Sequence, residues 1–242
     1  MIVLSFDIDW APEAVISDTV DLLRRYEVPA TFFATGPSSV LSGIDRSLFE
    51  IAIHPNPAAA DDVRAITALL ELYPESRGIR CHSLLTSTPL LNSCAKLGLE
   101  YESNQFFPYQ VPVFRDFNGL LRIALSWRDY FVLAAGQPTS FAALDIRPEL
   151  PAVFLFHPVH VFLNSESLGH YGRAKPHYHD PEALAGLRYA DAEGRRGIRD
   201  FLIELIEACR RQRRPLGRLA DLADQHRSRH GMAVTPALVR WF

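Results

Sequence analysis

Near its start the chain reads Ile2-Val-Leu-Ser-Phe-Asp7-Ile-Asp9-Trp-Ala-Pro12-Glu13. The apolar run is typical of a strand that is buried on both faces of a parallel sheet. Because alternate residues of a strand point to the same side, Asp7 and Asp9 are expected to point the same way from its carboxyl end. Pro12 favours a helix that starts at once. Two confined carboxylates need a basic group or a metal ion as a partner, and an incidental Asp pair in a solvated turn is the alternative.

Length, composition and charge predict a single globular domain. A chain of 242 residues suits an α/β barrel, and 15 Phe in a chain that is 48% hydrophobic supply a large core. The formal charge of −3 gives no general attraction to nucleic acid or anionic membranes, and the basic segment 210–214 is expected to be a solvated helix face. We therefore expect no nucleic-acid partner. No apolar run reaches transmembrane length, and the oligomeric state is left open.

The cysteines and the first residues indicate a cytoplasmic protein. Cys81, Cys94 and Cys209 are widely spaced, form no CxxC pair and suggest no disulfide framework. The first residues lack the basic segment of a signal peptide, and their short apolar run contains two aspartates.

Strands alternate with helices along the chain, which predicts a parallel sheet, either open or closed as a barrel. The absence of GxGxxG and P-loop patterns leaves the nucleotide-binding forms of the open sheet without support. Residues 164–193 are too long for an ordinary connection and are expected to form a functional lid or a mobile loop. The expected strands are 2–6, 30–35, 48–53, 78–82, 99–103, 120–126 and 152–156, and the expected helices are 15–26, 58–72, 88–97, 197–211 and 219–230, with 234–242 as a packed tail.

Several of the expected strands end in a charged or titratable side chain. The carboxyl ends of barrel strands meet on one face, where active sites are built. Asp and His together suit zinc or another first-row divalent ion, which lowers the pKa of a water molecule bound to it. A carboxylate can then accept a proton and a histidine can protonate a leaving amine, so the pattern predicts a metal-assisted hydrolase of amide or ester bonds. The side chains are Asp7, Asp9, His54, Arg80, His82 and His157.

Residues 2–164 resemble the polysaccharide deacetylases of carbohydrate esterase family 4. The resemblance rests on Ser5-Phe-Asp7-Ile-Asp9, Pro29-Ala-Thr-Phe-Phe-Ala-Thr-Gly36 and Glu50-Ile-Ala-Ile-His54-Pro. Two further strings, Arg80-Cys-His82-Ser-Leu and Phe156-His-Pro-Val-His-Val-Phe-Leu-Asn164, look most like a branch associated with bacterial O-antigen and other surface polysaccharides.

The resemblance implies a distorted (β/α) barrel and a role for each matching residue. Asp7 would be the base, held by Arg80, and His157 would be the acid. Asp129 would orient that histidine, although surface exposure explains Asp129 equally well. Asp9 and His54 would bind the metal.

One departure from the family pattern concerns the metal. The family has a second ligand histidine four residues after the first, where this chain has Ala58. His82 is the first candidate to complete the ligand set, with a sugar contact and a packed histidine as its alternatives. Two ligands rarely hold zinc, so without a third the site would be weak or lost.

Other residues near the strand ends are candidates for substrate binding. These are Trp10, Trp127 and His160, and structural packing is the better explanation for His160. Three histidines of the long loop have a spacing that would suit a second metal, but a lid with sugar-contacting Tyr and His is the preferred interpretation. They are His170, His177 and His179.

The sequence thus predicts a metal-dependent hydrolase that removes an N-acetyl group from a sugar or glycan precursor. Zinc is the first choice of metal, with nickel, cobalt and iron as alternatives. The rival functions are a deformylase or amidase acting on another small N-acyl substrate and a metal-free glycan-binding or assembly protein that kept the fold.

Overall fold

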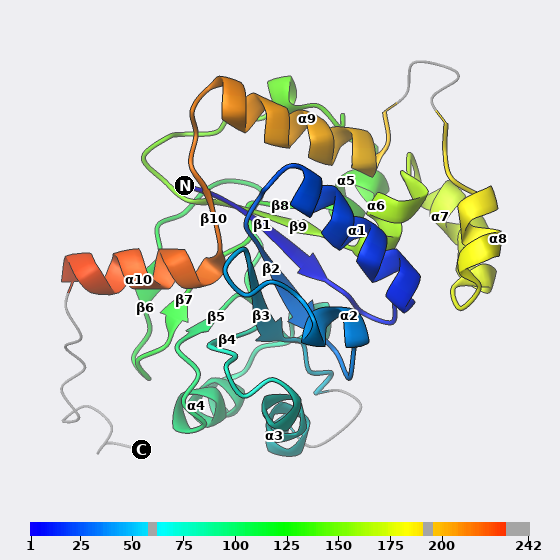
Figure 1. Cartoon of the computed structure of the whole chain (residues 1–242). Helices are drawn as coiled ribbons and strands as arrows, with labels where there is room; N and C mark the ends of the chain where they lie inside the picture. The colour runs from blue at the N-terminus through cyan, green and yellow to red at the C-terminus, as the bar shows by residue number, and fades with distance from the viewer. Residues whose placement is uncertain (58–61, 191–195, 231–242) are drawn as a thin grey trace.

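The computed structural model of the chain describes residues 1–57, 62–190 and 196–230 (Figure 1). Its strands form one sheet in the order β6-β7-β5-β4-β3-β2-β1-β9-β8, with β10 also paired to β1. Every pair is parallel except β6 with β7. The strands are β1 (Ile2–Asp7), β2 (Ala30–Ala34), β3 (Phe49–Ile53), β4 (Gly78–Ile79), β5 (Tyr101–Glu102), β6 (Phe114–Arg115), β7 (Leu121–Arg122), β8 (Trp127–Arg128), β9 (Ala152–Phe156) and β10 (Leu216–Gly217).

The sheet curls because β7 and β8 are separated by only four residues of chain. The Ile123 N–H donates to the Glu102 carbonyl beside β5, whereas the Ser126 N–H donates to the Val153 carbonyl in β9, each at 2.9 Å. One short segment therefore connects strands that lie toward opposite edges of the sheet. The predicted distorted barrel is confirmed in this form, as a curled and mostly parallel sheet.

Ten α-helices and three short 3₁₀ helices are present in the described part of the chain. In Figure 1, α1 and α9 lie over one side of the sheet, and α3 and α4 lie on the opposite side. The α-helices are α1 (Glu13–Arg25), α2 (Ser39–Ser42), α3 (Asp62–Leu72), α4 (Thr88–Lys96), α5 (Asp129–Ala135), α6 (Pro158–Leu163), α7 (Leu168–Ala174), α8 (Pro181–Gly186), α9 (Ile198–Arg211) and α10 (Leu219–His230), and the 3₁₀ helices are η1 (His82–Leu84), η2 (Phe141–Ala143) and η3 (Lys175–His177).

Alternation along β1 divides its side chains between two cores. Ile2, Leu4 and Phe6 belong to the core that includes buried residues of α1 and α9, and Val3 belongs to a second core with residues of β9 and α10. Ser5 and Asp7 share the parity of Val3 and therefore face the inside of the curled sheet. This alternation places the Asp7 carboxylate at the carboxyl end of the interior.

The two ends of the curled sheet are covered by different helices. In Figure 1, α10 lies at the amino ends of the strands, and α7 and α8 lie at their carboxyl ends. Leu219, Leu222 and Ala223 of α10 pack into the interior core. The amino end is thus filled by apolar side chains, whereas the carboxyl end holds the titratable groups.

Three sequence predictions are corrected. The strand expected over 78–82 ends at Ile79, so His82 lies in η1, and the strand expected over 120–126 is replaced by the separate strands β7 and β8. The described part of the expected loop 164–193 contains α7, η3 and α8. The expected tail 234–242 and the position of Ala58 lie outside the described residues.

Candidate active site

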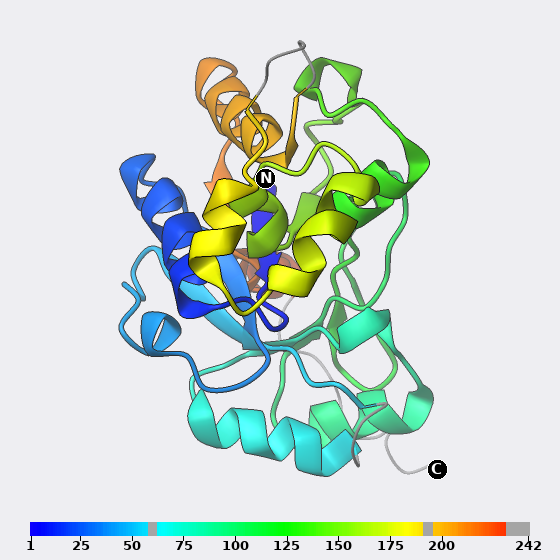
Figure 2. The same cartoon turned by 90° about the vertical axis from the view of Figure 1, so that its right-hand side faces the viewer.

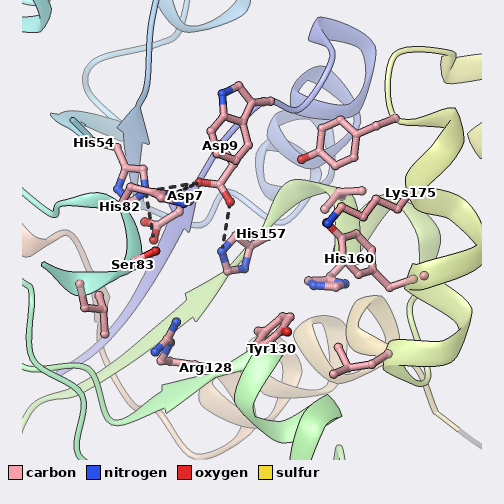
Figure 3. A pocket seen from close by; sticks show the side chains of 17 residues that line it. Asp7, Asp9, His54, His82, Ser83, Arg128, Tyr130, His157, His160 and Lys175 are labelled. Atoms are coloured by element: carbon pink, nitrogen blue, oxygen red, sulfur yellow. Dashed lines mark hydrogen bonds and ion pairs between the residues drawn. The ribbon is translucent and has the colours of Figure 1, made fainter. Parts of the chain in front are cut away.

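A pocket of about 510 Å³ opens at the carboxyl ends of the strands (Figure 3). Asp7 ends β1, His54 follows β3, His82 starts η1 after β4, and His157 follows β9. All four line this pocket together with Asp9. The structure therefore brings together strand ends that are far apart in the sequence, as the sequence predicted.

Arg80 holds one oxygen of the Asp7 carboxylate. The Arg80 side chain is fully buried, and its Nη1 donates to Asp7 Oδ1 at 2.7 Å. Its other nitrogens donate to Ser5 Oγ at 3.1 Å, to Ser103 Oγ at 3.0 Å and to the Ser103 carbonyl at 3.1 Å. The guanidinium is fixed on all sides and orients Asp7, whose Oδ2 lies 3.9 Å from His54 Nε2.

Asp9, His54 and His82 converge on one point. His54 Nε2 and His82 Nδ1 each lie 3.3 Å from Asp9 Oδ1. The Asp9 backbone has φ 45°, in the left-handed region that Asp tolerates better than most residues, and its carbonyl accepts a hydrogen bond from the Thr35 hydroxyl. Burial raises the Asp9 pKa, but the hydrogen bond from His54 and the charges of His157, His54 and His82 outweigh it and lower that pKa to about 2.

These three side chains fit a divalent metal ion. One carboxylate oxygen and two imidazole nitrogens are a donor set for zinc and similar ions. Their atoms lie within 4.8 Å of one another. Donors bound at zinc distances in a tetrahedral site stand roughly 3.3–3.4 Å apart, which is close to the 3.3 Å between Asp9 Oδ1 and each imidazole nitrogen. His82 thus supplies the third donor of a group that could hold a metal ion.

A second pair, Asp129 and His157, faces the same pocket. Asp129 is fully buried at the start of α5, and its Oδ1 lies 2.8 Å from His157 Nδ1. Its Oδ2 accepts the backbone N–H of His157 at 2.5 Å. Burial lowers the His157 pKa, but the charge and hydrogen bond of Asp129 and the charges of Asp9 and Asp7 raise it to about 9. His157 Nε2 points across the pocket, 3.6 Å from Asp9 Oδ2.

Comparison with known protein families identifies the chain. The family model described as WbmS-like polysaccharide deacetylase matches residues 4–175. The chain belongs to this family. No curated protein matches this WbmS-like chain.

Solved structures agree with that assignment. A Bordetella bronchiseptica protein, assigned as a polysaccharide deacetylase involved in O-antigen biosynthesis, is 32% identical to this WbmS-like chain, with a TM-score of 0.78 over 86% of this chain and 90% of that one. A family 4 acetyl xylan esterase from Clostridium thermocellum, in complex with a cobalt ion, has 17% identity and a TM-score of 0.50 over 99% and 96% of the two chains. A 4-alpha-glucanotransferase from Thermococcus litoralis has 13% identity and a TM-score of 0.53, covering 93% of this chain and 38% of that one. The last two show the fold alone.

The three predicted substrate contacts of this WbmS-like chain differ in position. Trp10 lines the pocket, is 58% exposed and packs edge-on against His82 with ring centroids 5.0 Å apart. His160 also lines it, but it is buried, and its Nδ1 lies 3.0 Å from Ser165 Oγ. Burial lowers the His160 pKa to about 4. Trp127 does not line this pocket, because its ring packs in the core, 4.7 Å from the Phe201 ring, but it does line a neighbouring pocket of about 300 Å³.

Part of the pocket wall was missed by sequence reasoning. Figure 2 views the molecule from the side of α7 and α8, which are drawn in yellow, and residues of α7 and η3 complete the wall. His170 is a packed histidine, with Nε2 2.7 Å from the Leu187 carbonyl, whereas His177 and His179 are exposed. Tyr171 and Tyr178 belong to the predicted lid with sugar-contacting Tyr and His, whereas no sequence signal marked the remaining residues of the wall. The missed residues include Arg128, Tyr130 and Lys175.

The described part of the chain has no helix with both the length and the apolar character needed to cross a bilayer. The predictions of a cytoplasmic location and of one domain over residues 1–242 stay predictions.

Proposed function

We propose that the chain is a metal-dependent hydrolase that removes an N-acetyl group from a sugar or glycan precursor of a bacterial surface polysaccharide. One observation carries the proposal: a convergent Asp–His–His group, an arginine-held carboxylate and a carboxylate-held histidine share one pocket. The O-antigen role of the Bordetella bronchiseptica relative supports the choice of surface polysaccharide.

Asp9, His54 and His82 would hold the metal ion, with zinc as the first candidate. A divalent ion bound there supplies polarisation of the acetyl carbonyl and lowers the pKa of water. The role of this chain is to present one oxygen and two nitrogen donors at matched distances. We assign the third ligand to His82, which replaces the histidine that the family places at position 58.

Asp7 is the proposed base. Arg80 occupies its Oδ1, which leaves Oδ2 directed at the pocket, close to His54. This oxygen accepts a proton from the water molecule that attacks the acetyl carbonyl carbon. The buried Arg80 guanidinium balances the Asp7 charge and prevents the carboxylate from turning away.

His157 is the proposed acid. With a pKa of about 9, its imidazole is protonated at neutral pH, and Asp129 fixes the ring through Nδ1. The Nε2–H donates a proton to the sugar nitrogen as the carbon–nitrogen bond breaks. The products are acetate and a sugar with a free amine. Trp10, at the mouth of the pocket, is the proposed platform for the sugar ring.

The test combines metal analysis with acetate release. Protein purified without chelators should contain close to one divalent ion per chain by elemental analysis, and a panel of N-acetylated sugars and sugar phosphates should include one that releases acetate. Asp9→Ala, His54→Ala and His82→Ala should each lose the metal and the activity. His170→Ala is the matched control, because that histidine lies outside the pocket.

The outcomes separate the rival functions. Metal retained in His82→Ala would keep the hydrolase but refute His82 as the third ligand. Formate release from an N-formylated sugar, with no acetate release from the N-acetylated panel, would favour a deformylase. If the chain binds no metal even after reconstitution, the mechanism is refuted and the glycan-binding function is favoured.

A further inference from the structure

Arg128, unlike Arg80, makes no ion pair or hydrogen bond with a carboxylate of the described residues. It ends β8, is half-buried and lines the pocket. Its Nε is fully buried and has no hydrogen-bond partner among the described residues. Arg80, by contrast, uses all three of its nitrogens on Asp7, Ser5 and Ser103.

The carboxylates near Arg128 are already occupied by other groups. Asp129 accepts from His157 through both oxygens and from the Tyr130 N–H at 2.6 Å. Asp7 is held by Arg80. Asp129 and Asp7 act on Arg128 through space, without hydrogen bonds to it. Arg128 is therefore not needed to hold either catalytic carboxylate in place.

A half-buried guanidinium that lacks a hydrogen-bonded counterion gains free energy when a ligand supplies the opposite charge. The guanidinium fork matches the paired oxygens of a carboxylate or a phosphate. A second cation, Lys175, lines the pocket as well, and Figure 3 shows it on the other side of His157 from Arg128 in this view. The pocket thus combines the hydrolytic groups with two positive charges that the proposed reaction does not use.

We propose that Arg128 binds an anionic group on the substrate, so that this chain acts on an acidic N-acetylated sugar rather than on a neutral one. This inference rests on the proposed function, and it names the substrate class. The anion is either a carboxylate on the sugar ring or a phosphate on its anomeric oxygen. In both cases two anionic oxygens meet the guanidinium.

If the anion is a phosphate, the position of Arg128 leaves space beyond it for a further substituent on that phosphate. Arg128 also lines an adjoining pocket of about 300 Å³, together with Phe106, Phe131 and Leu144. Its Cζ lies 5.5 Å from the centre of the Phe106 ring. A ring carboxylate would end at the guanidinium, whereas a group attached beyond a phosphate could continue into this apolar pocket.

The test measures the binding of three probes to the full chain by calorimetry: methyl N-acetylglucosaminide, N-acetylglucosamine 1-phosphate and N-acetylglucosaminuronate. At least one anionic probe should bind roughly 10- to 100-fold more tightly than the neutral probe, as expected for hydrogen bonds to a charged group. Arg128→Gln should remove this preference and leave the affinity for the neutral probe unchanged. Arg128→Lys should keep part of it.

Arg173→Gln is the matched control, because it removes one positive charge from an exposed position of α7 that does not line the pocket. It should leave all three affinities unchanged. Equal affinity of the wild-type chain for neutral and anionic probes would overturn the inference, as would an equal loss for all three probes in Arg128→Gln. Preference for the phosphate or for the uronate decides the source of the anion.

The two measurements distinguish a failure of the anion-site inference from a failure of the proposed function. Arg128-dependent binding with no acetate release from any sugar of the panel would support the anion site and refute the proposed function. Acetate release from the neutral sugar alone, unaffected by Arg128→Gln, would support the proposed function and refute the anion site. Thermal unfolding of each variant, followed by circular dichroism, checks that it is folded.

Discussion

Both ends of the curled sheet carry carboxylates, but the two ends differ in how completely the chain pairs those carboxylates. At the amino end, Glu50 accepts from Thr31 Oγ1 at 2.8 Å, from the Tyr101 hydroxyl at 2.7 Å and from the backbone N–H of Ala220 at 2.9 Å. All these donors belong to the chain and tie α10 to β2, β3 and β5.

At the carboxyl end the chain leaves polar atoms for something else to satisfy. Asp7 has one oxygen held and the other directed at the pocket, and Asp9 faces three histidines. His54 Nδ1 and Arg128 Nε are buried without partners among the described residues. The free Asp7 oxygen and the group of Asp9 with its three histidines lie at the end where substrate and metal would bind. Four variants test this contrast.

Asp7→Asn should have the largest effect. The amide keeps an oxygen for Arg80 but cannot accept a proton from water, so kcat should fall by roughly 10²- to 10⁴-fold, as expected for the loss of a general base. Metal content, measured by elemental analysis, should not change, because Asp7 is not a proposed ligand. Activity close to that of the wild type would show that the base lies elsewhere.

Asp129→Asn should have an intermediate effect and alter the pH dependence. His157 must be protonated to act as an acid, so activity should fall as the pH rises through its pKa of about 9. Removing the charge of Asp129 lowers that pKa, which moves the alkaline limb of kcat/KM to lower pH. The rate at neutral pH should drop roughly 10- to 100-fold. An unchanged alkaline limb in a full pH–rate profile would remove His157 from the acid role.

Glu50→Ala should have the smallest effect on catalysis and act on stability. It leaves the donors of Thr31, Tyr101 and Ala220 without their acceptor, and we expect the free energy of unfolding to fall by about 1–3 kcal/mol. Urea unfolding measures this loss. The specific activity of the folded fraction should stay at the wild-type value, and a large loss would show that the two ends are coupled.

Glu50→Gln sharpens the same comparison through pH. Burial raises the Glu50 pKa, against the hydrogen bonds from Ala220, Tyr101 and Thr31. Because the folded state holds the proton more tightly, the contribution of Glu50 is fully present below its unfolded pKa and is lost as pH rises through the folded pKa. Relative to Glu50→Gln, the wild-type chain should therefore gain stability as the pH is lowered from neutrality. A constant difference would contradict the raised pKa.

The sequence predicted much of the site because strand ends are local signals. An apolar run followed by a titratable residue identified Asp7, His54 and His157, and the curled parallel sheet then brings them together. The distances that link His82 to Asp9 required the structure, because η1 turns this residue out of the expected strand.

The parts that could not be predicted depend on short or distant elements. β8 has two residues, too few to show an alternation, so Trp127 was assigned to the pocket, whereas its neighbour Arg128 lines it. The helix over 219–230 was predicted with its observed bounds, but its packing depends on Glu50 and Thr31, far away in the sequence.

The pairing of β1 has a consequence for how the protein is made. The first strand hydrogen-bonds to β9, at residues 152–156, and to β10, at residues 216–217. During synthesis β2, its partner on the other edge, emerges early, whereas β9 and β10 leave the ribosome only after most of the chain has been translated, and contacts of such long sequence separation form slowly. A nascent chain that ends before β9 carries Asp7 at the end of a strand with one unpaired edge, and the candidate site, which includes His157, assembles among the last events of folding.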